Sequence, residues 1–446
     1  MPRVLPLILA LLLAVVACDS GTGATTTADD GSNTTTTTVS DETTTTGARE
    51  TTTTTSASAT TTVPDLSGVE NISEEVRAQL EELIGVAQEI RGLAFLEPPN
   101  ITVVSDEELE QRVREDIVED PEEFAADEAL YKTLGLLNDA ADFEQILLDL
   151  YGEQVAGFYD GETGEIVVPA REDGFSIVQQ GTIVHEFVHA LTDQHFAFHD
   201  TFDTMITEDR LDQAAAYQAL IEGDASWAEV LWVQTLSQEQ IGQFLAESLQ
   251  FDTEALDSAP RFLVESLLFP YDSGLAFIQS LYMDSNSWDM VNDAYSTMPD
   301  LPASTEQVIT PEDYRRDLPM EVEVPDVDLS GYELQRTSVW GEQGFRIMLN
   351  QGEGTETVAE AADGWGGDSY HQWYDGENAA LLVVYQGDTP GDVTELEEAL
   401  LSFALQDFPE EHFAWVDQLD GNLYFIAADD PEVGEQLRAA VGLDDT

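Results

Sequence analysis

TIVHEFVHALTDQHFAFHD (182–200) lies in the segment of the chain with the clearest helical pattern. Apolar or small residues recur there at steps of three and four, which is the spacing of one buried face of a helix. These residues are Ile177, Gly181, Val184, Val188 and Leu191. Ser176 and Gln179 form an S-x-x-Q pattern, so we predict a helix that begins after Ser176 with a capping box.

Two histidines of this helix are four residues apart, in HEFVH (185–189). Residues i and i+4 share one face of a helix, so His185 and His189 can present both imidazoles to one metal ion. Glu186 can reach a water bound to that ion without being a ligand. Because zinc lowers the pKa of bound water and a carboxylate can take its proton, the pattern predicts a Zn2+ site with Glu186 as general base. The alternative is a pair of helix histidines that only form hydrogen bonds.

A catalytic zinc site usually has three protein ligands and a water, so a third ligand is needed. His195 follows His189 by six residues, as in the metzincin pattern, but that pattern needs a glycine at the position of Thr192 to turn the chain back. Glu222, in ALIEGDASW, lies 33 residues after His189 on the next expected helix, and Gly223 would allow close backbone contact there. We therefore favour Glu222 over His195 as the third ligand.

The segments HEFVHALTDQHF and ALIEGDA together resemble the gluzincin arrangement of zinc metallopeptidases. More narrowly, most of residues 70–446 resemble poorly characterised exported prokaryotic lipoproteins that share HExxHALxDQxF, EGDA and GWGGD segments. The resemblance implies that His185, His189 and Glu222 bind zinc and that Glu186 is the general base in hydrolysis of a peptide or protein substrate. It also implies an α+β fold with a mainly helical, zincin-like domain that carries a small sheet.

Two positions depart from the pattern of such peptidases. Gluzincins often place an aspartate four residues after the ligand glutamate, where it orients a zinc histidine. Here that position is Ser226, while Asp224 lies two residues after Glu222. Related sequences also tend to carry a histidine at the position of Thr310. If that histidine stabilises the transition state, the side chains considered as replacements are Tyr314, Arg315 and His371.

Three further segments have weaker functional interpretations. His195 and His199 are four residues apart and could bind a second ion, although packing at a helix end is the more common role. DGWGGDSYHQW (363–373) is expected to form a packed corner between strands rather than a substrate-contacting loop. VAGFYD and EIVVP, joined by GETG (161–164), predict a hairpin that could pair with an extended substrate, by analogy with zincin-like sites.

The N-terminus, MPRVLPLILALLLAVVACDS (1–20), has the features of a bacterial lipoprotein signal peptide. Arg3 precedes an apolar region too short to span a bilayer comfortably, and the sequence V-V-A-C resembles a lipobox. We expect residues 1–18 to direct export, and Cys18, the only cysteine, to carry a lipid that anchors the protein on the extracellular or periplasmic side of the cell membrane. The alternative is an ordinary signal peptide.

The rest of the chain divides into three parts. Residues 19–64 are rich in threonine, cannot bury a core and are expected to be a disordered tether. Residues 65–328 are expected to form the mainly helical metallopeptidase domain, and 329–446 a small α+β domain. Helices are predicted at 72–91, 139–151, 208–232, 238–249, 260–283 (with a break at Pro270) and 395–405. Strands are predicted at 101–105, 155–160, 165–169, 379–387 and 422–430, whereas 284–330 is expected to be irregular.

The chain has 90 acidic and 15 basic residues, for a formal net charge of −75. Such a surface repels nucleic acids, which we exclude as partners. Strong self-repulsion at low ionic strength favours a saline habitat, and stability that falls as NaCl rises to molar concentration would contradict this hypothesis. The sequence thus predicts a surface-tethered zinc metallopeptidase. The alternative is a catalytically inactive cell-surface binding protein on a peptidase-like scaffold.

Overall fold

In the computed structural model, the described residues are 66, 69, 72–117, 121–152, 157–171, 174–250, 253–351, 355–406 and 408–443. The expected signal peptide, with Cys18, and the threonine-rich segment 19–64 lie outside these residues. Within the described ranges, no helix has the length and apolar character needed to cross a membrane. The described chain has an α+β fold, with a mainly helical part followed by a five-stranded C-terminal sheet.

The helix that carries the HEFVH motif is α6 (Ile177–Phe196), and it begins as the sequence predicts. Ser176 Oγ accepts a hydrogen bond from Gln179 N–H, and the Gln179 side chain accepts one from Ser176 N–H, so the predicted capping box is confirmed. The predicted apolar stripe is buried. The helix continues through Thr192, whose hydroxyl donates to carbonyls of the preceding turn, and ends where Ala197 adopts a left-handed conformation.

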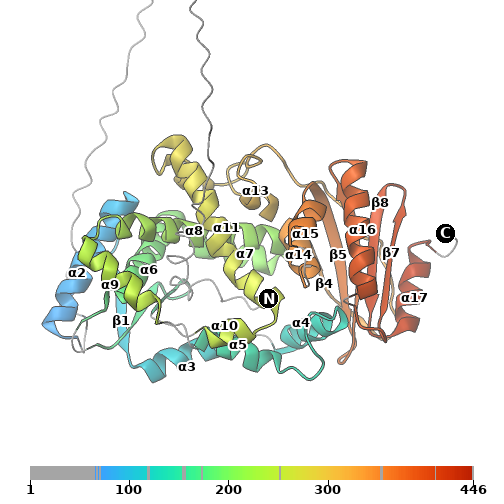
Figure 1. Ribbon diagram of the computed structural model, residues 1–446, viewed down its shortest axis with the longest axis horizontal. Coiled ribbons are helices and arrows are strands. Elements are labelled where there is room, and N and C mark those ends of the chain that lie inside the picture. Colours follow the sequence, from blue (N-terminus) through green and yellow to red (C-terminus); the bar gives the residue numbers. More distant parts are fainter. Residues whose placement is uncertain are drawn as a thin grey trace, which may run out of the picture.

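Most of the helical part of the molecule consists of other helices (Figure 1). They are α2 (Glu74–Arg91), α3 (Asp106–Ile117), α4 (Pro121–Thr133), α5 (Phe143–Gly152), α7 (Phe198–Thr207), α8 (Leu211–Val233), α9 (Gln238–Ser248), α10 (Glu254–Ser258), α11 (Arg261–Ser285), α12 (Asp289–Ala294) and α13 (Thr305–Ile309). The expectation that 284–330 is wholly irregular is wrong, because α12 and α13 lie within it; both are too short to show a clear helical period.

Helices α8 and α11 cross at very short range through two glycines. A Cβ atom added at Gly223 would lie 2.2 Å from the carbonyl oxygen of Gly274, and one added at Gly274 would lie 2.2 Å from the carbonyl oxygen of Ala219. The close backbone contact predicted at Gly223 is therefore confirmed. Because Glu222 is the preceding residue, this crossing also fixes where its carboxylate lies.

The predicted break at Pro270 is wrong, because α11 runs from Arg261 to Ser285 without interruption. Proline has no N–H to bond to the Ser266 carbonyl, so one helical hydrogen bond is missing. Phe269, Pro270 and Tyr271 are buried against neighbouring elements, and this packing holds the helix together across the missing bond.

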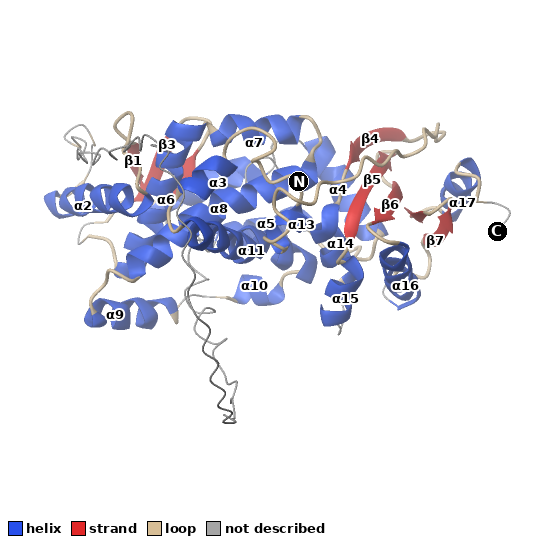
Figure 2. Cartoon of the chain, turned by 90° about the horizontal axis from the view of Figure 1, so that it is seen from above, coloured by secondary structure: helices blue, strands red, loops and turns tan. Residues whose placement is uncertain are grey.

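A three-stranded sheet packs against α6 (Figure 2). Its central strand, β3 (Glu165–Pro169), pairs in parallel with β1 (Asn100–Val104) and antiparallel with β2 (Phe158–Asp160). The predicted hairpin is thus present, and β2 lies at the sheet edge. Ile166, Val167 and Val168 are fully buried, so the centre of the sheet is part of the core under the motif helix.

The C-terminal sheet is antiparallel, with the order β4-β5-β6-β8-β7. Its strands are β4 (Glu333–Ser338), β5 (Trp365–Tyr374), β6 (Ala379–Gly387), β7 (Phe413–Leu419) and β8 (Asn422–Ala428). Its helices are α14 (Gly341–Leu349), α15 (Thr355–Ala362), α16 (Pro390–Gln406) and α17 (Pro431–Ala440). The DGWGGDSYHQW segment forms strand β5 instead of the expected corner, and its aromatic side chains are buried in the cores on the two faces of the sheet.

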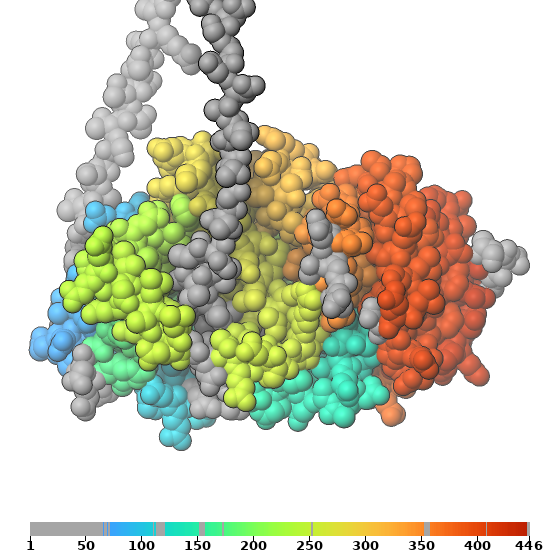
Figure 3. Space-filling model, viewed as in Figure 1, coloured from blue at the N-terminus to red at the C-terminus, as the bar shows by residue number. Residues whose placement is uncertain are grey.

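Alternate residues of β6 belong to two different cores. Leu381, Val383 and Tyr385 join the main core, which extends into the helical part, whereas Leu382 and Val384 join a second core beneath α17. The C-terminal part forms one continuous side of the molecule next to the helices (Figure 3). Because one apolar core crosses the boundary, the two parts are packed together firmly.

Candidate metal centre

Helices α6 and α8 bring together two histidines and one glutamate. Nε2 of His185 lies 3.2 Å from Oε2 of Glu222, and Nε2 of His189 lies 3.5 Å from the same oxygen. One ligand atom from each of the three residues lies within 4.8 Å of the others. The three ligands expected from the sequence therefore converge on one point.

These three side chains and Glu186 are completely buried. Burial lowers the pKa of His185 to about 4, with the neighbouring His189 adding to this effect, and burial lowers the pKa of His189 to about 3. Both imidazoles are therefore neutral near pH 7, which is the form that binds a metal ion. Burial raises the pKa of Glu222, against the effect of hydrogen bonds with His185 and Tyr271.

Several buried polar atoms of this cluster have no hydrogen-bond partner, namely Nδ1 of His185, both ring nitrogens of His189, Oε1 of Glu222 and Oε1 of Glu186. Buried polar groups normally have partners, so this concentration of unpaired atoms needs an explanation. Two imidazoles and one carboxylate form the donor set of many catalytic zinc sites. The residues present therefore fit a zinc ion, with His185, His189 and Glu222 as its ligands.

Glu186 is held by the edge strand of the small sheet. Its Oε2 accepts a hydrogen bond from Tyr159 N–H at 2.9 Å, which leaves Oε1 free. Burial raises the pKa of Glu186 well above its ordinary value, and the nearby Glu222 contributes to the increase. A divalent cation on the neighbouring ligands would favour the ionised carboxylate and act against this increase.

Glu229 also lies at the site, although it was not predicted from the sequence. Its Oε2 is 3.8 Å from Nδ1 of His185, the ring nitrogen that faces away from Glu222. Burial raises the pKa of Glu229 to about 8. Glu229 follows Glu222 by seven residues, or two helical turns, and this spacing is the signal that could have found it.

Asp224 interacts with the helices around the site and not with the three ligands. Its Oδ1 is 2.7 Å from Nε of Arg91, and its Oδ2 accepts a hydrogen bond from the Tyr295 hydroxyl at 3.0 Å. Arg91 is fully buried, and its guanidinium lies 4.4 Å from the ring centroid of Trp288. Asp224 therefore connects α8 with α2 and α12.

The other histidines of the opening stretch lie apart from the three ligands. His195 Nε2 is 2.8 Å from the Ala94 carbonyl oxygen, at the end of α6. His199 lies in α7, and its ring packs against the hairpin turn at Gly161. Among the described residues, neither belongs to a cluster of ligand atoms that could hold an ion.

The residues considered as replacements at Thr310 also have partners elsewhere. The Tyr314 hydroxyl donates to the Asp300 carbonyl, and Arg315 pairs with the Asp300 carboxylate at 2.9 Å. His371 lies in β5, with its ring against Trp373. None of these contacts involves His185, His189 or Glu222.

Aromatic residues from two helices line the site instead. The ring centroid of Tyr271, in α11, lies 6.4 Å from that of His185. The ring centroid of Phe198, in α7, lies 6.1 Å from that of His189. A second cluster of acidic side chains, Glu306, Asp317 and Asp388, lies outside this site and contains no histidine.

Comparison with known proteins covers only the C-terminal part. Residues 330–438 match a domain of unknown function (DUF8575). This region begins just before β4 and ends within α17. No curated protein and no solved structure matches the chain.

Proposed function

We propose that the chain is a zinc-dependent metallopeptidase that hydrolyses peptide bonds, with His185, His189 and Glu222 as the zinc ligands. The observation that carries the proposal is the convergence of these three side chains, beside unpaired buried atoms of His189 and Glu186. Zinc bound there would lower the pKa of a coordinated water and polarise the substrate carbonyl.

Glu186 is proposed to take the proton from the attacking water and to pass it to the leaving amine. Tyr159 N–H holds Oε2 of Glu186, so Oε1 is the atom available for this transfer. Because Tyr159 lies in the edge strand β2, an extended substrate paired along that edge would pass close to Glu186. The Tyr271 hydrogen bond to Glu222 helps to hold that carboxylate in place.

The cellular setting is part of the same proposal. A signal peptide and a lipid on Cys18 would place the protein outside the cell membrane, with the threonine-rich segment as a tether. A peptide or protein is then the substrate within reach.

A catalytically inactive binding protein is the second candidate function. The observation in its favour is that His185, Glu186, His189 and Glu222 have no exposed surface, so a substrate cannot reach them in this conformation. A peptidase would have to open the site, whereas a binding protein would not.

The two functions are separated by measuring zinc content together with cleavage of an unfolded protein. We expect stoichiometric zinc and chelator-sensitive cleavage in the wild type. Glu186→Gln should keep the zinc and lose about 100-fold or more of the rate. Glu222→Ala should lose zinc, whereas His195→Ala should retain it. Wild-type protein that is loaded with zinc but cleaves no faster than Glu186→Gln would leave the binding protein as the function.

A further inference from the structure

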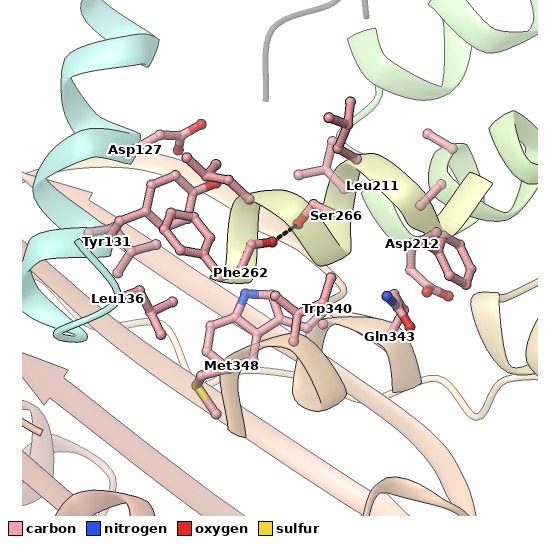
Figure 4. Close-up of a pocket in the computed structure, with 18 of the residues that line it drawn as sticks. Asp127, Tyr131, Leu136, Leu211, Asp212, Phe262, Ser266, Trp340, Gln343 and Met348 are labelled. Atoms are coloured by element: carbon pink, nitrogen blue, oxygen red, sulfur yellow. Dashed lines mark hydrogen bonds between the residues drawn. The ribbon is translucent and has the colours of Figure 1, made fainter. Parts of the chain in front are cut away.

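A large cavity lies between the helical part and the C-terminal sheet, with a volume of about 460 Å³. Its walls come from α4, α5, α7, α8 and α11 on one side and from β4, β5 and α14 on the other. Figure 4 shows Phe262, Trp340 and Met348 around this space, with Asp127 and Asp212 at its margins. This volume is typical of sites that bind small molecules or peptide side chains.

Most of the lining is apolar. Helix α4 contributes Tyr131, α11 contributes Phe262 and Leu263, and α14 contributes Met348, with Trp340 directly before α14. Such walls favour an apolar ligand, because the removal of apolar surface from water is favourable.

One end of the cavity is polar and acidic. It continues into a second, smaller depression lined by Glu122, Glu123, Asp127, Asp209 and Arg336. Arg336 is paired with Asp127 at 2.7 Å, with Glu123 and, at 3.6 Å, with Asp209, so its charge is already neutralised. Glu122 is exposed and Asp209 is half-buried, and the four carboxylates exceed the one guanidinium. This end therefore attracts a cation.

The cavity also reaches the elements that hold the metal ligands. Gln218 lines it and lies one helical turn before Glu222 on the same face of α8. Phe202 lines it and lies one turn after Phe198, whose ring faces His189. Pro270 lines it and directly precedes Tyr271. A chain seated in the cavity would thus lie next to the proposed catalytic centre.

We propose that this cavity is the substrate-binding subsite and that it selects polypeptide segments in which large apolar side chains adjoin a lysine or arginine. This inference rests on the proposed peptidase function. The apolar walls bury the large side chains, and the acidic end pairs with the basic residue. A free fatty acid has an apolar chain as well, but the carboxylates at this end repel its head group.

The subsite gives the C-terminal part a function. Trp340, Gln343 and Met348, from the region that matches the domain of unknown function, form one wall of the cavity. The helical part provides the metal ligands, and the C-terminal part completes the surface that recognises the substrate.

The test is a binding measurement on the zinc-loaded Glu186→Gln protein, which binds substrate without cleaving it. The probe is a dye-labelled, leucine-rich peptide that ends in two arginines, and binding is followed by fluorescence anisotropy. Ser266→Phe fills the cavity from α11 and should weaken binding about tenfold or more. Its control is Ser258→Phe, on α10, because both hydroxyls donate to the carbonyl four residues earlier at 2.7 Å and Ser258 is exposed.

The acidic end is tested separately with Asp209→Asn. The expected loss of affinity is about two- to fivefold at low salt, and it should vanish for a peptide that ends in two glutamates. Asp420→Asn is the matched control, because Asp420 has the same φ of 54° and lies in an exposed turn outside the cavity.

The outcomes distinguish this inference from the proposed function. Equal affinities for the Ser266→Phe and Ser258→Phe proteins would overturn the subsite even if the wild type cleaves proteins. Tighter binding of the acidic peptide, or of a fatty acid, would also overturn it. A Ser266-dependent affinity in a protein that never cleaves would support the subsite and reject the peptidase.

Discussion

Glu229 has the position expected of a residue that orients a zinc ligand. It lies 3.8 Å from Nδ1 of His185, while Nε2 of the same ring faces Glu222. Groups in this second layer around a metal fix the tautomer and direction of the histidine, and their loss typically weakens metal binding 10- to 100-fold. The two atoms are too far apart for a hydrogen bond, so we expect, as a prediction, that Glu229 positions His185 and is not a ligand.

We expect Glu229→Gln to lower zinc affinity about tenfold while the protein stays folded, because the amide cannot accept from the imidazole as strongly as a carboxylate does. Competition with a chromophoric chelator measures the change. Glu239→Gln, at an exposed position in α9, is the control. Identical zinc affinities for the two variants would show that Glu229 does not position His185.

The sequence predicted the convergence of the three candidate ligands better than it predicted the residues around them. His185, His189 and Glu222 follow from helical spacing and the resemblance together, because ligand chemistry restricts both residue type and position. The pattern of such peptidases predicts an orienting carboxylate at Ser226, one turn after Glu222, whereas the carboxylate that lies near His185 is one turn further on, at Glu229. Contacts between a histidine of α6 and a carboxylate of α8 depend on the distance between the two helices. The spacing of residues along one helix does not reveal that distance.

At the scale of elements, the crossing of α8 and α11 decides where Glu222 lies. The two backbones touch at Gly223 and Gly274, where an added Cβ would lie 2.2 Å from a carbonyl oxygen. The sequence predicted the contact at Gly223 but predicted a break in α11 at Pro270. A proline usually breaks a helix, but here packing along the crossing stabilises α11 both before and after Pro270.

We expect Gly274→Ala to destabilise the protein by about 1–3 kcal/mol, because the helices must move apart to admit the methyl group. Chemical denaturation of the zinc-free protein measures the free energy of unfolding. Gly242→Ala in α9 is the control, since no atom lies within 4 Å of its added Cβ, and it should stabilise by up to about 1 kcal/mol. A Gly274→Ala protein as stable as the wild type would mean that the crossing tolerates separation.

At the scale of the whole molecule, the helical and C-terminal parts meet at buried carboxyl groups. Asp212 of α8 accepts hydrogen bonds from Thr305 and lies against Gly341, where a Cβ would be only 1.7 Å from its Oδ1. Asp368 of β5 accepts from the backbone N–H groups of Trp340 and Gly341. Burial raises the pKa of Asp212 to about 7, with Asp368 adding to the increase, and burial raises that of Asp368 to about 6.

These raised pKa values predict how the stability of the whole molecule depends on pH. In the unfolded chain both groups ionise near pH 4, whereas in the folded protein they keep their protons to about pH 6 to 7. Their contribution to stability is therefore complete below about pH 4 and is lost as pH rises towards 7. Glu342, whose pKa burial raises to about 7, acts in the same direction.

Replacing Asp212 by asparagine should remove one part of this pH dependence. The amide oxygen can still accept from Thr305, but the side chain no longer titrates. We expect the loss in free energy of unfolding between pH 5 and pH 8 to shrink by about 2–3 kcal/mol relative to the wild type. Urea denaturation at a series of pH values and fixed high salt measures it, with Asp420→Asn as the exposed control. If Asp212→Asn and the wild type lose stability in parallel over this range, Asp212 is already ionised in the folded protein, and the junction between the two parts contains a buried negative charge.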